Sequence, residues 1–592
     1  MTGEKQIQLP SWDLSDLYDS IDSVKFVDDL VRAQDLCKNF AKDYQGKITR
    51  LLAPDLANSI KRYEQISDLL EKIGSYAFLV FATDQLDEKR STFYQDTTEK
   101  INHISRYLIF YSLELNKINE IDLAAKLKDK NLAYYQPWLR DLRVFKPYQL
   151  AENQEQILHQ KQITSNQAWV KLFDETQAQM RFDYDAKSLS NQEIFKLLTA
   201  VERTTREKAA KAIEQQFVQH AKIFASITNV VAKDKQINDD LRGFALPISA
   251  RNIANLIEDE VVNKLIVTVK ANYQHLSHDF YQLKAKILGL NKLEYWDRLA
   301  PIQQVAEIYI PWPEAVQIVL EAYHTFSPLM AKIAQEFIDN GWVDAILRPG
   351  KYSGAFACAV APSVHPYVLV NYQGKARDVM TLAHELGHAV HMQLAKTQGA
   401  LMCTVPLILA ETASIFAEQL TFELLLKREQ NPEVKKSILA NKIDDLLSTV
   451  VRQIAFTEYE LGVHNSRAKG ELTIDQLNKI WLKTQQESLG PIFHFSEKYK
   501  YFWQYVPHFI HSPFYVYAYA FANCLVNSLY AQYKTDSTSF VNKYIEMLAA
   551  GGSKRYNQLL ARFDLDANEE HFWQSGLDVI ANYINQLKIL VA

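Results

Sequence analysis

The sequence predicts a mainly α-helical protein with a small β-sheet. Apolar residues recur three and four positions apart over most of the 592 residues, and charged residues separate them. Only 17 glycines and 17 prolines interrupt this pattern, so turns are few and long helices are favoured. An apolar share of 48% is ample for a large buried core.

The N-terminal part of the chain is predicted to form long antiparallel helices packed as a bundle. Residues 11–18 (SWDLSDLY) come first; their Asp and Ser side chains can cap a helix, while Trp and Leu can dock on the body. Helical periodicity then runs from residue 24 to about residue 131. Pro137 and Pro147 indicate a break over residues 131–149, after which helices resume at residues 152–180.

The middle of the chain is also predicted to be helical, with one short strand before it. Residues 180–185 (MRFDYD) alternate briefly between apolar and polar side chains, which is typical of a strand. Helical patterns dominate residues 191–273. After a loop around residues 292–313, a single helix is expected at residues 314–340.

Two β-prone stretches follow. Residues 352–360 (YSGAFACAV) are mostly small, and residues 367–372 (YVLVNY) form a good predicted strand. The next helix is expected at residues 375–394, with Asp378 as its N-terminal cap or first-turn acid. Beside a metal site, the two strands can offer an edge to which an extended peptide pairs through main-chain hydrogen bonds. Alternatively, they form a small structural hairpin.

The helix expected at residues 375–394 carries the pentad His384-Glu385-Leu386-Gly387-His388. Residues four apart share one face of a helix, so the two imidazoles can bind one metal ion, and Glu385 can reach a water molecule on that ion. Gly387 lowers helix stability by about 1 kcal/mol relative to alanine, which is reasonable where another segment must approach the backbone closely. The alternative is a buried helix whose histidines only pair with carboxylates.

A catalytic zinc site needs a third protein ligand beside two histidines. A metzincin would have Gly and His where this chain has His391 and Leu394, so that class is excluded. Glu411 is the first carboxylate after the pentad, on a second helix that Pro406 can open. It lies in an otherwise apolar turn, where a buried carboxylate without a partner would be unfavourable. Glu418, seven residues later, can accept a hydrogen bond from a ligand histidine, or it is an ordinary surface acid.

Two further stretches near the C-terminus carry candidate functional groups. Residues 451–460 form a predicted helix with polar groups on one face, where Arg452 is by default an ordinary salt-bridge partner. Residues 499–519 are the most aromatic stretch of the chain and can belong to the core. Several of them, however, carry hydrogen-bond donors that a purely apolar core would not favour, namely His508, His511, Tyr515, Tyr517 and Tyr519.

Composition limits the classes of partner and compartment. The net charge is −5 with both signs well mixed, so neither nucleic acid nor an anionic membrane is an expected partner. The N-terminal residues lack the apolar segment of a secretory signal, and no stretch of 18 apolar residues occurs. The 4 cysteines are scattered, which argues against a disulfide framework or a thiolate metal site and favours a cytoplasmic location.

Five segments together match the pattern of one known family: Trp12–Tyr18 (WDLSDLY), Gly350–Phe356 (GKYSGAF), Thr381–Ala389 (TLAHELGHA), Ala410–Ser414 (AETAS) and Pro513–Tyr519 (PFYVYAY). On these segments, which extend over most of the chain, it resembles the oligoendopeptidase F group of the thimet oligopeptidase-like zinc metallopeptidases. That resemblance implies a fold in which two helical lobes enclose a deep substrate channel, with the small β-sheet beside the zinc site.

The same resemblance implies roles for individual residues. His384, His388 and Glu411 would bind one Zn²⁺ per chain, and Glu385 would be the general base. A histidine and one or two tyrosines of the aromatic stretch would lie beside the scissile carbonyl. His508 and Tyr519 match that pattern best, and Tyr515 is a further candidate.

The sequence therefore predicts a zinc-dependent endopeptidase that hydrolyses internal bonds of short, unstructured oligopeptides. Its catalytic domain would span residues 196–592, after an N-terminal helical domain of residues 1–195. Oligopeptide substrates are the expected partners, and no oligomeric state is indicated. An exopeptidase is the main alternative, because a carboxypeptidase needs a cation for the terminal carboxylate and Arg452 is a candidate. A catalytically dead, peptide-binding helical scaffold is a further alternative.

Overall fold

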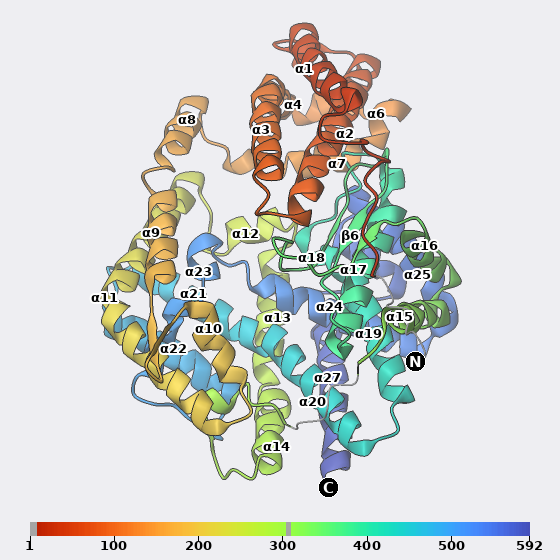
Figure 1. Cartoon of the computed structure of the whole chain (residues 1–592). Coiled ribbons are helices and arrows are strands. Elements are labelled where there is room, and N and C mark those ends of the chain that lie inside the picture. Colours follow the sequence, from red (N-terminus) through yellow and green to blue (C-terminus); the bar gives the residue numbers. More distant parts are fainter. Residues whose placement is uncertain (1–8, 303–308) are drawn as a thin grey trace. The chain divides into compact units, whose positions relative to one another are not determined.

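A computed structural model describes residues 9–302 and 309–592 of the chain. Helices predominate, and the strands are few and short, so the predicted mainly α-helical class is confirmed (Figure 1). The chain forms two compact units: unit 1 comprises Met1–Lys146, Glu307–Arg428 and Tyr533–Asp564, and unit 2 comprises Pro147–Ala306, Glu429–Gln532 and Leu565–Ala592. These units follow the packing of the chain, and the domain boundary expected near residue 195 stays a prediction.

The α-helices of unit 1 come from all three of its stretches, and several have a capping side chain or a proline at their start. They are α1 (Val24–Tyr44), α2 (Ala53–Thr83), α3 (Glu88–Ser105), α4 (Ile109–Lys117), α5 (Glu120–Lys126), α6 (Lys130–Tyr134), α7 (Gln136–Leu142), α15 (Trp312–Phe326), α16 (Pro328–Asp339), α17 (Ala376–Ala395), α18 (Leu407–Ala410), α19 (Thr412–Arg428), α25 (Ser537–Ala549) and α26 (Tyr556–Leu560). Ser23 caps α1 by accepting from the backbone N–H of Phe26, and Asp87 caps α3 by accepting from that of Arg90. Pro54 lies in the first turn of α2, where its missing N–H is no loss.

The N-terminal segment docks on unit 1 as its sequence predicts. Leu17 and Tyr18 are buried, and the Tyr18 hydroxyl donates a 2.9 Å hydrogen bond to Asp29 in α1. The Trp12 ring meets the ring of Tyr367 edge-on, with centroids 6.0 Å apart. These contacts join the start of the chain to the small sheet that follows.

The sheet of unit 1 contains β4 (Val343–Asp344), β5 (Phe356–Cys358) and β6 (Tyr367–Leu369) in the order β4-β6-β5. β4 runs parallel to β6, and β5 runs antiparallel to it, so β5 is an edge strand. The two predicted strands are confirmed as β5 and β6. The two-residue β4 is too short to leave an alternating pattern in the sequence.

Lys351 fixes the loop that leads to β5. Its side chain is buried, with Nζ 2.6 Å from a carboxylate oxygen of Asp344. The same Nζ donates to the backbone carbonyls of Ile346 at 2.9 Å and Val370 at 2.7 Å. A buried ammonium group with all its donors used is well satisfied, so this lysine ties the loop firmly to the sheet.

The single helix expected at residues 314–340 is wrong, because the structure has α15 and α16 with Ser327 between them. The side chain of Ser327 accepts from the backbone N–H of Met330 and so caps α16. Pro328 follows in the first turn, and a proline there cannot donate to the preceding turn of a continuous helix.

The break expected at residues 131–149 is also wrong in its detail. That stretch forms the short helices α6 and α7, and a 3-10 helix follows at Lys146–Tyr148. Pro137 lies in the first turn of α7, where proline begins a helix instead of ending one.

Unit 2 contains the remaining α-helices: α8 (Glu152–Lys161), α9 (Asn166–Gln179), α10 (Asn191–Lys196), α11 (Arg203–Arg242), α12 (Ser249–Ala254), α13 (Asp259–Ala271), α14 (Asp279–Ile287), α20 (Pro432–Thr449), α21 (Val451–Arg467), α22 (Ile474–Leu489), α23 (His508–His511), α27 (Glu570–Val591) and most of α24 (Tyr517–Thr535). The short strand predicted at residues 180–185 is present as β1 (Phe182–Tyr184), which pairs with β2 (Lys187–Leu189). β3 (Leu293–Glu294) and β7 (Phe493–His494) form a parallel pair. None of the helices in the described residues is both long and apolar enough to cross a membrane.

Candidate metal centre and active site

The pentad lies in the middle of α17, close to the bounds that the sequence predicts. Asp378 in the first turn accepts hydrogen bonds from the backbone N–H groups of Gln373 at 2.8 Å and Lys375 at 3.0 Å. These N–H groups belong to residues just before α17, so Asp378 is a first-turn acid that fixes the entry of the chain into the helix, as the sequence predicts.

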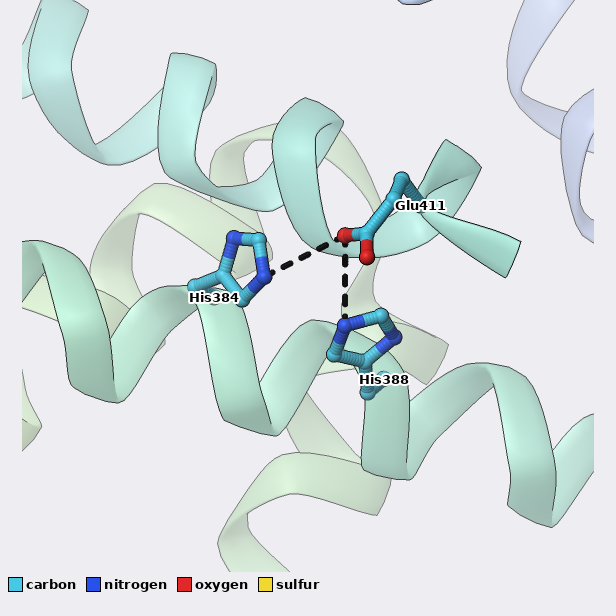
Figure 2. A group of neighbouring side chains, drawn as sticks. All are labelled: His384, His388 and Glu411. Carbon is cyan, nitrogen blue, oxygen red and sulfur yellow. Dashed lines mark ion pairs between the residues drawn. The ribbon is translucent and has the colours of Figure 1, made fainter. Parts of the chain in front are cut away.

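Three side chains from two neighbouring segments converge beside this helix, as Figure 2 shows. One carboxylate oxygen of Glu411, Oε2, lies 3.3 Å from Nε2 of His384 and 3.3 Å from Nε2 of His388. The two imidazole rings are 4.9 Å apart and almost perpendicular, at 83°. The structure thus brings together the three residues proposed from the sequence as metal ligands.

Gly387 makes this convergence possible. A Cβ atom at this position would lie 2.8 Å from the carbonyl oxygen of Ala413 and 2.8 Å from Cα of Ser414, both in α19. Only a residue without a side chain allows α17 and α19 to approach so closely. The expectation that another segment approaches this backbone is confirmed, and the close approach places Glu411 beside the histidines.

Glu411 itself lies between α18 and α19, and two neighbours orient the centre. The hydroxyl of Ser414 donates a 2.7 Å hydrogen bond to the same Oε2 that faces the histidines. Oε2 of Glu418 lies 3.5 Å from Nδ1 of His384, on the opposite side of that ring from Glu411. A carboxylate in this position fixes the tautomer of a ligand histidine, as expected for Glu418.

Electrostatics in the centre are dominated by these acids. Burial acts to lower the pKa of His384, but its hydrogen bonds to Glu411 and Glu418 outweigh that effect and raise the pKa to about 10. Burial acts to raise the pKa of Glu411, but the hydrogen bonds from His384 and His388 outweigh it and lower the pKa. The two carboxylates around His384 therefore favour positive charge at this place.

The distances fit the geometry of zinc. A tetrahedral ion with bonds of about 2.0–2.1 Å has ligand atoms about 3.3–3.4 Å apart. Both Nε2-to-Oε2 distances are 3.3 Å. Two imidazole nitrogens and one carboxylate oxygen are also the donor set of many catalytic zinc sites.

Glu385 faces this centre from the buried side of α17, with 7% of its surface exposed. The backbone N–H of Ala357 in β5 donates a hydrogen bond to its carboxylate. Burial nevertheless raises the pKa of Glu385 above its usual value, helped by the nearby Glu411. A carboxylate with a raised pKa is a stronger base, which suits proton transfer near neutral pH.

A cavity of about 530 Å³ in unit 1 opens beside the three convergent residues. Residues of β5, α17 and the loop before α18 line it, among them Phe356, Ala357, Val360, Met392 and Cys403. β5 is an edge strand of the sheet, and Phe356 and Ala357 of this strand line the cavity.

The aromatic stretch in unit 2 brings three predicted residues together. The hydroxyl of Tyr519 lies 3.4 Å from Nε2 of His508, and the ring centroids of His508 and Tyr515 are 5.8 Å apart. Tyr515 and Tyr519 are 5.3 Å apart. Burial lowers the pKa of His508, and the nearby His511 lowers it further.

Other donors of that stretch have structural partners. His511 lies 2.7 Å from a carboxylate oxygen of Asp174, and the Tyr517 hydroxyl accepts a 2.7 Å hydrogen bond from Asn255. Arg452 donates to the hydroxyl of Tyr505 and lies over the Phe456 ring, 4.9 Å from its centroid. Its guanidinium therefore has an aromatic setting instead of the salt bridge expected by default, and the carboxypeptidase alternative gains no support from it.

Sequence reasoning missed Ser414, Ala357 and Lys351. Ser414 follows Glu411 by three positions, so helical spacing alone was a signal that its hydroxyl can reach the carboxylate. Ala357 acts through its backbone, and its residue type therefore carries no signal.

Comparisons with known proteins show the family to which the chain is similar. A model of peptidase family M3 matches residues 196–579, and a model described as Oligopeptidase F matches residues 114–182. An oligoendopeptidase F homolog from Borreliella burgdorferi is 28% identical, over 92% of this chain and 92% of its own length. Oligopeptidase PepF from Bacillus subtilis is 24% identical, over 98% of this chain and 87% of its own length.

Solved structures share the fold. A crystal structure from Chlamydophila abortus has a TM-score of 0.89 at 23% identity and covers 98% of both chains. Oligoendopeptidase-F from Enterococcus faecium has a TM-score of 0.71 at 20% identity, over 96% of this chain and 99% of that chain.

Proposed function

Since the chain belongs to peptidase family M3, whose members are metallopeptidases that hydrolyse peptides, we propose that it is a zinc-dependent endopeptidase acting on short, unstructured oligopeptides. One observation carries this proposal: Nε2 of His384 and Nε2 of His388 each lie 3.3 Å from a single oxygen of Glu411, with Glu385 buried beside them. A half-buried carboxylate oxygen that faces two imidazole nitrogens offers a cation three ligand atoms at once, which supports metal binding.

In this proposal His384, His388 and Glu411 hold one Zn²⁺ per chain. When bound, the ion supplies Lewis acidity, which lowers the pKa of a coordinated water toward about 7. Glu418 orients His384 through Nδ1, and Ser414 orients the carboxylate of Glu411.

Glu385 is the proposed general base. Its carboxylate takes the proton of the attacking water and passes it to the nitrogen of the leaving amine. The raised pKa of Glu385 supports this role, and the N–H of Ala357 holds the carboxylate in one orientation.

His508, Tyr515 and Tyr519 are proposed to donate hydrogen bonds to the oxygen of the scissile carbonyl as negative charge develops there. An imidazole and two phenols can all donate hydrogen bonds, and these three side chains form one cluster. Loss of one such donor typically lowers the rate by about 10²–10³-fold.

The proposed substrate class is supported by the cavity and by β5, the edge strand beside it. An extended peptide can add to this edge through main-chain hydrogen bonds, which hold a chain without reading its sequence. The relatives are described as oligoendopeptidase and oligopeptidase, which supports short peptides as substrates here too. A cytoplasmic location is part of the proposal and is supported by the four free cysteines.

The decisive experiment measures metal content and cleavage together. The purified protein should contain one zinc per chain by elemental analysis and should cleave a quenched fluorescent peptide blocked at both termini. A chelator should abolish cleavage and added Zn²⁺ should restore it, because the three ligands cannot supply the Lewis acid themselves. Cleavage only of peptides with a free terminus would show an exopeptidase, and cleavage that persists without metal would refute the proposal.

A further inference from the structure

The turn between α23 and α24 has an unusual backbone. The N–H of Tyr515 donates a 3.0 Å hydrogen bond to the carbonyl of Ser512, so residues 512–515 form a β-turn with Pro513 in second place. Phe514, in third place, has φ +59°. A turn of this kind normally has glycine or asparagine there, because a side chain with a Cβ is strained at positive φ. Something must therefore hold Phe514 in this conformation.

Glu460 of α21 provides the direct restraint. Its Oε1 accepts a 2.7 Å hydrogen bond from the backbone N–H of Phe514. Glu460 has 2% of its surface exposed and Phe514 has none, so water does not compete for this bond. The carboxyl group of Glu460 thus fixes the direction of the Phe514 N–H bond. This N–H lies at one end of the N–Cα bond about which the strained φ angle is measured.

Further contacts close around the turn. Arg251 of α12 donates to the carbonyl of Pro513 at 3.3 Å, and its guanidinium carbon lies 5.8 Å from the centroid of the Tyr515 ring. The Phe514 ring lies 4.8 Å from the ring of His464 and 5.6 Å from Nζ of Lys235. The peptide group between Pro513 and Phe514 is therefore held at both its carbonyl oxygen and its N–H, and the Phe514 ring packs beside His464.

Glu460 is a costly residue to bury there. Its second oxygen, Oε2, has no hydrogen-bond partner among the described residues. Burial raises the pKa of Glu460 to about 8, while the Phe514 N–H, Arg251 and Lys235 act against this rise. A group that lowers stability in this way is expected where it serves the active site.

The turn also links the three proposed oxyanion donors. His508 precedes it in α23, Tyr515 is its last residue, and Tyr519 follows in the first turn of α24. Any change in φ of Phe514 rotates the chain on one side of the turn relative to the other, and so separates His508 from the two tyrosines.

We propose that Glu460 is a positioning residue that locks the turn at Phe514 and thereby sets the mutual placement of His508, Tyr515 and Tyr519. This inference rests on the proposed peptidase function, in which those three side chains face the reacting bond. Glu460 acts through the backbone of the turn and transfers no proton.

Three substitutions separate the position of the acceptor oxygen from the presence of an acid group. Glu460→Gln keeps an acceptor oxygen at the same place, Glu460→Asp keeps the carboxyl group but withdraws it by one methylene, and Glu460→Ala removes it. We expect kcat of the Gln variant to stay near the wild-type value and kcat of the Asp and Ala variants to fall about 10–100-fold, since a displacement of about 1 Å at reacting groups has effects of this size. KM and zinc content should change little, because donors to the developing oxyanion act mainly in the transition state.

Glu458→Ala is the matched control. Glu458 lies on the same helix and pairs with Lys270, away from the turn, so its loss should leave kcat near the wild-type value. If instead the Asp variant were active and the Gln variant inactive, Glu460 would be a proton carrier and the proposal would be wrong. Equal kcat for all three Glu460 variants would also overturn it.

Hydrogen exchange tests the turn without using activity. Mass spectrometry of a peptide covering residues 509–519 should show faster exchange in the Asp and Ala variants, but not in the Gln variant or the Glu458 control. If the wild-type protein cleaves no peptide, the proposed function fails, and the exchange rates still decide whether Glu460 locks the turn. Should the Ala variant not fold, the comparison of Asp with Gln decides the question, and unchanged exchange in the Asp variant refutes the proposal.

Discussion

At Glu411, a single carboxylate oxygen contacts three side chains: Nε2 of His384, Nε2 of His388 and the hydroxyl of Ser414. The two imidazoles are pre-arranged by their four-residue spacing on α17, and the carboxylate comes from a different segment. Preorganisation of this kind means that little rearrangement is needed when a cation enters.

Glu385→Gln should lower kcat for oligopeptide cleavage by about 10²–10⁴-fold, because the amide cannot accept the proton of the attacking water. The amide has nearly the same shape, and the metal ligands are untouched, so zinc content should remain at the wild-type level. The check is elemental analysis beside a quenched-peptide assay. Wild-type cleavage by this variant would show that another group is the base.

Residues with local signals could be predicted from the sequence, and those that act over long separations could not. The pentad is read from spacing along one helix, and Glu411 from the cost of leaving a carboxylate unpaired in an apolar turn. Glu460 had no such signal, because nothing in the sequence reveals that Phe514 adopts φ +59°. Aromatic residues with donors suggested a polar cluster, but His511 proved to pair with Asp174 instead.

At the scale of the element, the close packing of α17 on α19 is the feature that builds the centre. It depends on Gly387, whose missing side chain leaves room for the backbone at Ala413 and Ser414. The cost of a glycine within the helix is about 1 kcal/mol, which is smaller than the cost of forcing two helices apart.

Gly387→Ala should lower the free energy of unfolding by about 1–3 kcal/mol, as expected for overpacking of a tight core contact. It should also weaken zinc binding, because α19 must move away and carries Glu411 with it. Gly387→Val should lower both the free energy of unfolding and the affinity for zinc more than Gly387→Ala does. Thermal unfolding and zinc titration of the two variants are the measurements, and an alanine variant with wild-type zinc affinity would show that the helix contact does not set the ligand geometry.

The course of the helices was predictable where apolar periodicity is long, and less so at their ends. The metal-bearing helix was expected at residues 375–394 and is found at Ala376–Ala395. Residues 314–340 keep a helical period across Ser327, so periodicity alone could not show the break that Ser327 and Pro328 impose. Conversely, Pro137 and Pro147 suggested irregular chain, although proline is well tolerated in the first turn of a short helix.

At the scale of the whole molecule, the predicted helical class is correct, and the substrate channel remains an expectation. The class follows from long amphipathic stretches and few glycines, which are properties of the entire chain. The division into units could not be read from the sequence, since each unit assembles three distant stretches whose mutual contacts leave no local pattern.

Short flexible peptides should be cleaved, and a native globular protein should not, if the site lies in an enclosed channel. The same globular protein, once cleaved chemically into short unfolded fragments, should become a substrate, because flexible segments can then pair with the edge of β5. Mass spectrometry of the products from both samples gives the comparison. Rapid digestion of the native protein would contradict an enclosed site.

The order in which unit 1 is assembled has a consequence for synthesis of the chain. Its last stretch, Tyr533–Asp564, supplies α25, and the hydroxyl of Tyr544 in that helix donates to the carbonyl of Thr412 at the start of α19. While a ribosome is still producing unit 2, the pentad helix has already emerged but lacks this late partner. A nascent chain of this kind exposes apolar faces for much of its translation. Chaperones that shield such faces should therefore raise the yield of folded protein. Their effect should be larger here than for proteins whose units each fold from one contiguous stretch.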